Sequence, residues 1–260
     1  MTRVLSGAVL IAFAVGVVWY ASNQIFLLVA ALLVGLGVNE LVTLAHASRL
    51  NVAFWPALVA ALLVLVSVGA AGRGLEAALM AALVGVGLAT LGEWRGDAQV
   101  LATAAASLFP ALYLGLPVGA LVAVRAFSGP RGLFLLMLTV IVSDSMQYYT
   151  GRLFGRRPLA PLVSPKKTIE GALGGFLFGT ALFASVGAWW LPEMPLAVRI
   201  GLGLSIVALG IAGDLFESML KRSANVKDSS TLIPGHGGIL DRIDALLFAA
   251  PVYYIVLKYV

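Results

Sequence analysis

The residues best suited to chemistry lie together in one short window of an otherwise apolar chain. Charged residues make up 11% of the sequence, yet acidic and basic side chains recur throughout the segment GDLFESMLKRSANVKDSSTLIPGHGGILDRID, residues 213–244. Apolar sequence borders this window on both sides. Because folding charges of both signs into apolar surroundings costs free energy, the window is expected to have a function.

The spacing within this window suits a divalent cation together with phosphate groups. Asp214 and Lys221 are seven positions apart and share one face of a predicted helix. The segment PGHGG, residues 234–238, cannot continue a helix and predicts a tight turn whose backbone amides can approach an anion closely. Asp241 and Asp244 follow at the start of the next predicted helix. Mg²⁺ prefers oxygen ligands and is commonly shared between one or two carboxylates and substrate phosphate.

A second polar segment, residues 144–171, reads DSMQYYTGRLFGRRPLAPLVSPKKTIEG. Asp144 lies in a predicted span, and an irregular stretch ends at Ser164-Pro165. The next three residues, KKT, lead into a glycine-rich helix start. Basic side chains at a helix N-terminus form an anion site, because the free amides and the helix dipole add to their charge. The small residues there also let neighbouring helices approach closely.

The elements that position these residues are predicted to be transmembrane helices. The mean hydropathy is +1.01, and 61% of the residues are hydrophobic. These values predict an all-α, polytopic integral membrane protein, because a span needs roughly 20 apolar residues. The fifth span is long enough to be tilted or broken, at Pro110 or Pro117. This rule places about nine transmembrane helices near residues 4–20, 25–45, 53–71, 75–92, 99–124, 132–150, 169–191, 196–219 and 239–257.

Loop charges and composition predict orientation and exclude some chemistry. With nine spans, most of the basic residues, including those of both polar segments, share the face of the N-terminus, which the positive-inside rule places in the cytoplasm. The first span is expected to remain as an anchor.

The chain is predicted to be a single membrane domain, 1–260, with residues 1–140 mainly scaffold and 141–250 catalytic. The absence of cysteine excludes thiolate chemistry, and two histidines argue against a His-rich transition-metal site.

The first window resembles the signature of the phosphatidate cytidylyltransferase family, the CDP-diacylglycerol synthases. The family pattern is Ser-x-apolar-Lys-Arg, four residues, Lys-Asp, a short run to His-Gly-Gly, and finally Asp-Arg-apolar-Asp. This chain has, in register, Ser218, Leu220, Lys221, Arg222, Lys227, Asp228, His236, Gly237, Gly238, Asp241, Arg242, Ile243 and Asp244. SPKKTIEG and GDLFES also resemble the family, and the likeness covers roughly residues 140–250. Gln147 and the polar run Ser229-Ser230-Thr231 depart from the pattern and could adjust lipid choice or loop packing.

This resemblance implies a reaction between CTP and phosphatidic acid that gives CDP-diacylglycerol and pyrophosphate. The lipid phosphate would attack the α-phosphorus of CTP, so that catalysis rests on positioning and charge neutralisation. The family uses Mg²⁺, with a monovalent cation such as K⁺ as a companion. The expected partners are CTP, phosphatidic acid and membrane lipids, without nucleic acid, and a homodimer is an open alternative. The expected location is the inner, cytoplasmic membrane of a bacterium, with the active site facing the cytoplasm.

The site residues divide into three predicted roles. Metal ligation is assigned to Asp214 and Asp241. Asp244 is a third metal ligand or instead caps the loop or supports Arg242. Substrate binding is assigned to Asp144, Lys166, Lys167, Thr168, Gly237, Gly238 and Arg242. Catalytic roles are assigned to Lys221, Arg222, Lys227, Asp228 and His236.

Several alternatives stay open at this level. Lys166 and Lys167 bind substrate phosphate or serve only as orientation charges. Glu217 is a third metal ligand or, as the spacing favours, the partner of Lys221. Glu40, in a predicted span, is either a functional carboxylate or a hydrogen-bond partner, of Asn39 or of another helix.

Two other classes of function compete with this hypothesis. The first is a related CTP-dependent enzyme on another lipid, such as a prenol kinase or an ether-lipid cytidylyltransferase. The second is an ion-coupled transporter, which usually holds its charges near the midplane in broken helices and often shows inverted repeats. Here the charges cluster in loops on one face and no repeat is visible.

Overall fold

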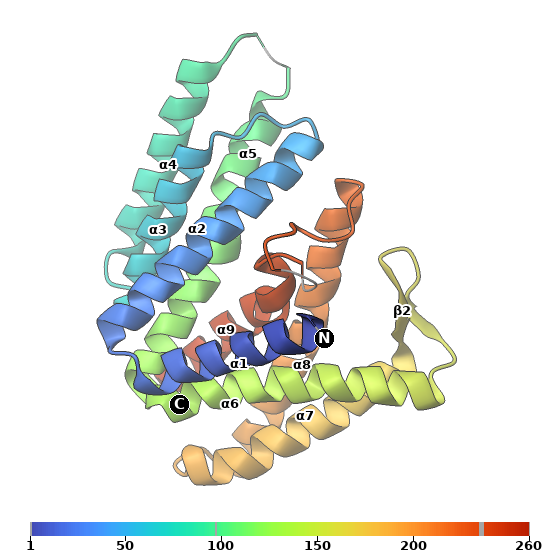
Figure 1. Ribbon diagram of the computed structural model, residues 1–260. Coiled ribbons are helices and arrows are strands. Elements are labelled where there is room, and N and C mark those ends of the chain that lie inside the picture. Colours follow the sequence, from blue (N-terminus) through green and yellow to red (C-terminus); the bar gives the residue numbers. More distant parts are fainter. Residues whose placement is uncertain (1, 97, 234–236, 260) are drawn as a thin grey trace. The chain divides into compact units, whose positions relative to one another are not determined.

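The computed structural model describes residues 2–96, 98–233 and 237–259, and helices dominate these segments (Figure 1). The predicted all-α class is confirmed apart from one short hairpin. The helices are α1 (Thr2–Tyr20), α2 (Asn23–Ala47), α3 (Phe54–Gly69), α4 (Leu75–Glu93), α5 (Val100–Pro110), η1 (Ala111–Gly115), α6 (Leu116–Phe154), α7 (Ile169–Trp190), α8 (Leu196–Ser223) and α9 (Leu240–Tyr259). The hairpin consists of β1 (Pro158–Ala160) and β2 (Ser164–Thr168).

The apolar runs of the sequence become helices, but the count of about nine spans is not confirmed. Within the described residues, five helical segments are both long and apolar enough to cross a membrane. One of them, Val100–Phe154, contains the two spans expected at 99–124 and 132–150 as a single run of 55 residues. The apolar helices Gly7–Tyr20 and Phe54–Gly69 are shorter than the other candidates. These segments identify the chain as an integral membrane protein, because helices satisfy their own backbone groups in lipid.

Two irregularities interrupt the long run of residues 100–154. The π-helical segment η1 begins directly after Pro110, one of the two positions at which a break was predicted. Proline has no amide to donate and so disturbs a helix, and single π turns are a second recognised interruption of α-helices. The second irregularity is Gly129, whose φ of 65° and ψ of −169° lie outside helical values, immediately before Pro130. Glycine adopts a positive φ at little cost, so a kink stands where a loop between two spans was expected.

The chain divides into two compact units, and the boundaries between them fall within the helices α6, α8 and α9. Unit one comprises Met1–Ala123 and Leu220–Arg242, and unit two comprises Val124–Met219 and Ile243–Val260. The polar window 213–244 is therefore divided, with its central part in unit one and both of its ends in unit two.

Unit one is organised around α3, which packs against α2, α4, α5 and η1. Figure 1 shows α2, α3 and α4 running alongside one another. Ala57, Ala61 and Val64 on α3 are fully buried, so small side chains bring the neighbouring helices close to its backbone. At the closest point, a Cβ added to Gly115 of η1 would lie 2.5 Å from the carbonyl oxygen of Ala61, so only glycine fits there.

Unit two depends on glycines of α7, which the sequence predicted to allow close helix approach. A Cβ at Gly171 would lie 2.7 Å from the carbonyl oxygen of Gln147 on α6, and one at Gly174 would collide with the side chain of Thr150. The hydroxyl of Tyr253 on α9 donates to the carbonyl of Gly132 at 2.8 Å and joins α9 to α6. The prediction that small residues let these helices approach closely is confirmed.

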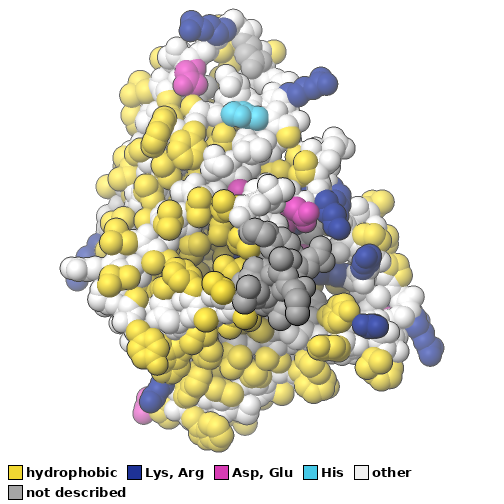
Figure 2. Space-filling model, in the orientation of Figure 1, with side chains coloured by type: hydrophobic (Ala, Val, Ile, Leu, Met, Phe, Trp, Pro, Cys, Tyr) yellow, Lys and Arg dark blue, Asp and Glu magenta, His cyan; other side chains and the backbone are white. Residues whose placement is uncertain are grey.

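Hydrophobic side chains cover much of the face drawn in Figure 2. Many large apolar residues are exposed, among them Leu101 on α5, Leu153 on α6 and Trp189 on α7. Lipid rather than water is the natural surrounding for such a surface.

Candidate functional site

The segment before α7 is a β-hairpin rather than the irregular stretch expected to end at Ser164-Pro165. β1 and β2 pair antiparallel, with Pro158 opposite Thr168 and Ala160 opposite Ser164. Alternate residues of a strand point to opposite sides, so the hairpin separates two neighbouring lysines. Lys167 forms an ion pair with Asp214 of α8, whereas Lys166 is exposed.

Local capping fixes the junction of this hairpin with α7. Thr168 is the N-cap residue of α7, and its hydroxyl accepts from the amide of Gly171 at 3.1 Å. The carboxylate of Glu170 accepts from the amides of Arg156 and Arg157 at 3.0 and 3.2 Å. Thr168, predicted to bind substrate, therefore has a structural role that holds β2 and its lysines at the start of the helix.

Unit two brings together three of the predicted acidic residues. Asp144 of α6, Asp214 of α8 and Asp244 of α9 are close enough to interact electrostatically with one another and with Lys167; we call these three residues the acidic cluster. Asp144 accepts from the side-chain amide of Gln147 at 3.0 Å, so this departure from the family pattern contacts a site residue. Three carboxylates repel one another, and Lys167 supplies a compensating positive charge.

The acidic cluster has the donor chemistry of a magnesium site. Its carboxylates provide the hard oxygen ligands that Mg²⁺ prefers. Among the described residues, no three acidic or histidine side chains are placed closely enough to hold a metal ion as they stand. The metal roles of Asp214 and Asp244 thus remain predictions.

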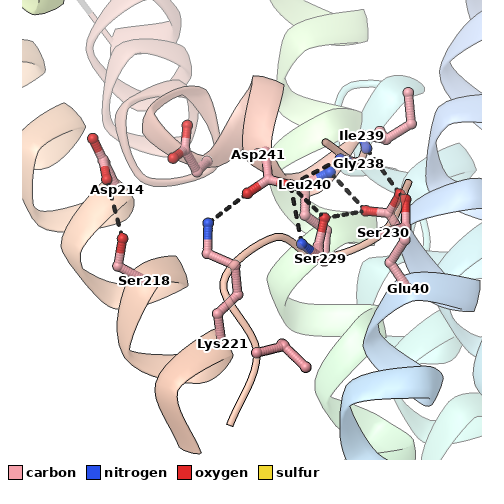
Figure 3. Close-up of polar contacts among 12 residues, drawn as sticks. Glu40, Asp214, Ser218, Lys221, Ser229, Ser230, Gly238, Ile239, Leu240 and Asp241 are labelled. Atoms are coloured by element: carbon pink, nitrogen blue, oxygen red, sulfur yellow. Dashed lines mark hydrogen bonds and ion pairs between the residues drawn. The ribbon is translucent and has the colours of Figure 1, made fainter. Parts of the chain in front are cut away.

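In unit one, Asp241 is the centre of a network that joins α8, the segment between α8 and α9 (residues 224–239, called the polar loop) and the start of α9 (Figure 3). Its Oδ1 forms an ion pair at 2.5 Å with Lys221, and both side chains are at least nine-tenths buried. Its Oδ2 accepts from the amide of Ser229 at 3.0 Å, the hydroxyl of Ser229 at 2.8 Å and the amide of Gly238 at 2.8 Å. The carboxylate predicted to hold a metal thus fixes the loop onto the first turn of α9 in this structure.

Glu40 of α2 lies beside the same network and is 2% exposed. Its Oε1 accepts from the hydroxyl of Ser230 at 2.7 Å and the amide of Ile239 at 2.9 Å. Its Oε2 accepts from the hydroxyl of Ser229 at 2.8 Å and the amide of Leu240 at 2.9 Å. Of the two alternatives left open for Glu40, the structure confirms hydrogen bonding, directed at the loop and at α9.

The sequence predicts no site role for Ser229 or Ser230, whose polar side chains depart from the family pattern. Each of these side chains binds Glu40. The signal that could have found them was the coincidence of an intramembrane carboxylate with two hydroxyl groups in a predicted site loop.

The remaining predicted residues lie mostly at the surface of the polar loop and of the helix ends beside it. Lys227, Asp228 and Arg242 are exposed, and Arg222 donates to the carbonyl of Val226 at 3.0 Å. Gly237 has a φ of 81°, a conformation that favours glycine, and its carbonyl accepts from the amide of Ile233. His236 lies outside the described residues.

Comparison with known proteins gives a consistent result. A model of the cytidylyltransferase family matches residues 1–260. The chain is 36% identical over 263 residues to the phosphatidate cytidylyltransferase of Pseudomonas aeruginosa, and the alignment covers 96% of this chain and 94% of that protein.

Two further relatives match over shorter stretches. Identity is 38% over 169 residues to the phosphatidate cytidylyltransferase of Thermotoga maritima, which covers 63% of either chain. It is 42% over 125 residues to that of Aquifex aeolicus, which covers 48% of this chain and 46% of that protein. The chain thus aligns with about half to two thirds of the length of these two relatives. Because the family model matches the whole sequence, this chain belongs to the cytidylyltransferase family.

Proposed function

We propose that this chain transfers the cytidylyl group of CTP to phosphatidic acid and releases pyrophosphate. The observation that carries the proposal is the acidic cluster with its ion-paired Lys167, set among otherwise apolar helices and supplied by three of them. Carboxylates with an adjacent lysine suit a nucleotide whose phosphates are bound to a divalent cation. The names of the relatives support the same activity and the same lipid acceptor.

In the proposed reaction, a phosphate oxygen of phosphatidic acid forms a bond to the α-phosphorus of CTP. The bond from that phosphorus to the bridging oxygen breaks, and pyrophosphate leaves with the electron pair. No protein nucleophile is needed, so the side chains act by positioning and by neutralising charge. Mg²⁺, when bound, would neutralise phosphate charge, with Asp214 and Asp244 of unit two as proposed ligands. The metal role of Asp241, which lies in unit one, is a separate proposal. A monovalent cation such as K⁺ is the proposed companion.

The basic side chains receive the phosphates in this proposal. Lys167 lies at the N-terminal end of α7, where charge and free amides favour an anion. The proposed catalytic residues belong to the polar loop and its flanks. They are the basic residues Lys221, Arg222 and Lys227, with His236 and the acidic Asp228. The proposed location is the bacterial inner membrane, with the site open to the cytoplasm where CTP is found.

A double-label assay distinguishes this reaction from its nearest rival. Purified protein in detergent is given phosphatidic acid, Mg²⁺ and CTP labelled with ³²P at either the α or the γ phosphate. Cytidylyl transfer moves the α label into the lipid fraction and leaves the γ label in pyrophosphate. A prenol kinase would instead move the γ label into the lipid fraction. A parallel reaction with a prenol in place of phosphatidic acid tests for this kinase activity. Transfer of the γ label, or no transfer to phosphatidic acid, would refute the proposal.

A further inference from the structure

Glu40 is an acidic side chain from the part of the sequence predicted to be scaffold, yet its side chain accepts four hydrogen bonds from the polar window. Its bonds run to Ser229, Ser230, Ile239 and Leu240, which precede and follow residues 234–238 in the sequence. The two backbone donors are Leu240, the first residue of α9, and Ile239, which directly precedes it, and amides at a helix start have no partner inside the helix. One buried carboxylate therefore caps α9 and holds the preceding loop against it.

The network makes Glu40 and Asp241 act on the same groups. The hydroxyl of Ser229 is 2.8 Å from a carboxylate oxygen of each residue, and its single proton can serve only one of them at a time. A Cβ at Gly238 would collide with that hydroxyl and with both oxygens of Glu40. Gly238, the second glycine of the HGG motif, must therefore be glycine, because Glu40 and Ser229 occupy the space that a side chain would need. The amide of Gly238 donates to Asp241.

We infer that Glu40 is a positioning residue for the predicted reaction, acting through Ser229, Ser230 and the first turn of α9. The inference rests on the proposed function, because it takes Asp241 and the polar loop as parts of the active site. Glu40 is assigned no contact with the transferred group. It sets the place of Asp241 and, through Asp241, of Lys221.

The isosteric change Glu40→Gln tests this role sharply. Each carboxylate oxygen of Glu40 accepts from one backbone amide, Ile239 or Leu240. A glutamine amide has one NH₂ group, and whichever way it turns, that group faces a backbone N–H that cannot accept. The change therefore removes at least one of the two bonds to α9, whereas the serine hydroxyls can rotate to accept.

The kinetic experiment measures kcat and KM for CTP and phosphatidic acid on detergent-purified variants. We expect Glu40→Gln to lower kcat/KM by roughly 10- to 100-fold, as for residues that orient a site through its ligands. Ser230→Ala removes one bond and is expected to cause a smaller loss, which keeps the test valid if Glu40→Gln fails to fold. Glu76→Gln makes the same chemical change at an exposed position of α4 and is expected to leave kcat/KM unchanged. Unchanged kinetics in both Glu40→Gln and Ser230→Ala would overturn the inference.

A labelling experiment separates loop positioning from general stability without using activity. The sequence has no cysteine, so Ile239→Cys and Val64→Cys each introduce a single thiol, the first beside Glu40 and the second in the core of α3. Adding Glu40→Gln is expected to speed thiol labelling at position 239 and not at position 64. Equal acceleration at both positions would show a purely structural role and overturn the inference. Absence of turnover in the unmodified chain would instead refute the proposed function, and the labelling would still decide the role of Glu40.

Discussion

Lys166 and Lys167 are adjacent in sequence, yet the structure predicts different consequences for their loss. Lys167 forms an ion pair with Asp214 of the acidic cluster, and the two side chains are 21% and 27% exposed. Lys166 lies on the opposite side of β2 and is exposed. Both lysines carry the same charge and lie on the same strand, so Lys166→Gln is a matched control for Lys167→Gln.

The magnitude follows from the partial burial of this pair. A hydrogen bond to a charged group is worth about 1.5–3 kcal/mol. Because the two side chains keep some exposure, we take the lower part of this range, about 1.5–2 kcal/mol, which is about 10- to 30-fold in kcat/KM. Lys167→Gln should cause this loss, because it also leaves three carboxylates without their cation. Lys166→Gln should stay within about 2-fold, as expected for an exposed surface charge.

The assay measures kcat/KM for each substrate on detergent-purified variants, with thermal unfolding as a check that they are folded. Selective loss in Lys167→Gln supports a role on substrate phosphate or on the acidic cluster. Equal losses in both variants would refute the difference drawn between the two lysines. Unchanged kcat/KM in both variants would refute a role on substrate and leave the lysines as orientation charges. A pure orientation role would also invert a fraction of the chains in the membrane, which the labelling described next would detect.

Three further predictions follow from the same geometry. Asp241→Asn should lower turnover by at least about 100-fold if the carboxylate holds the metal, and near-normal turnover at ordinary Mg²⁺ concentrations would refute that role. Single cysteines placed at the exposed positions Leu162 and Thr231 should not react with a membrane-impermeant thiol reagent in intact cells, but should react after permeabilisation. Labelling in intact cells would overturn the cytoplasmic orientation. Gly174→Ala should destabilise the protein by about 1–3 kcal/mol, because its Cβ would overlap a threonine of α6. Gly201→Ala has open space and should be neutral or stabilising by up to about 1 kcal/mol, so equal melting temperatures for the two variants would contradict this packing.

The sequence by itself predicted the helices and identified each member of the acidic cluster as a site residue, but it grouped Asp214 with Asp241 rather than with Asp144. Apolar runs determine membrane helices because lipid offers no partner to the backbone, and glycine and proline mark where such runs bend. The charges of Asp144, Asp214 and Asp244 were visible as costly exceptions to an apolar composition. Their grouping in unit two follows once the helices that carry them pack together.

Only the tertiary structure decided which polar residues act on one another. The difference between Lys166 and Lys167 depends on strand pairing in a hairpin too short and too rich in proline to have a recognisable strand pattern. The contact between Glu40 and Ser229 joins residues 189 positions apart. Local spacing reports on neighbours within a helix or a strand, whereas such a bond forms only when packing brings a buried carboxylate to unpaired helix amides and loop hydroxyls.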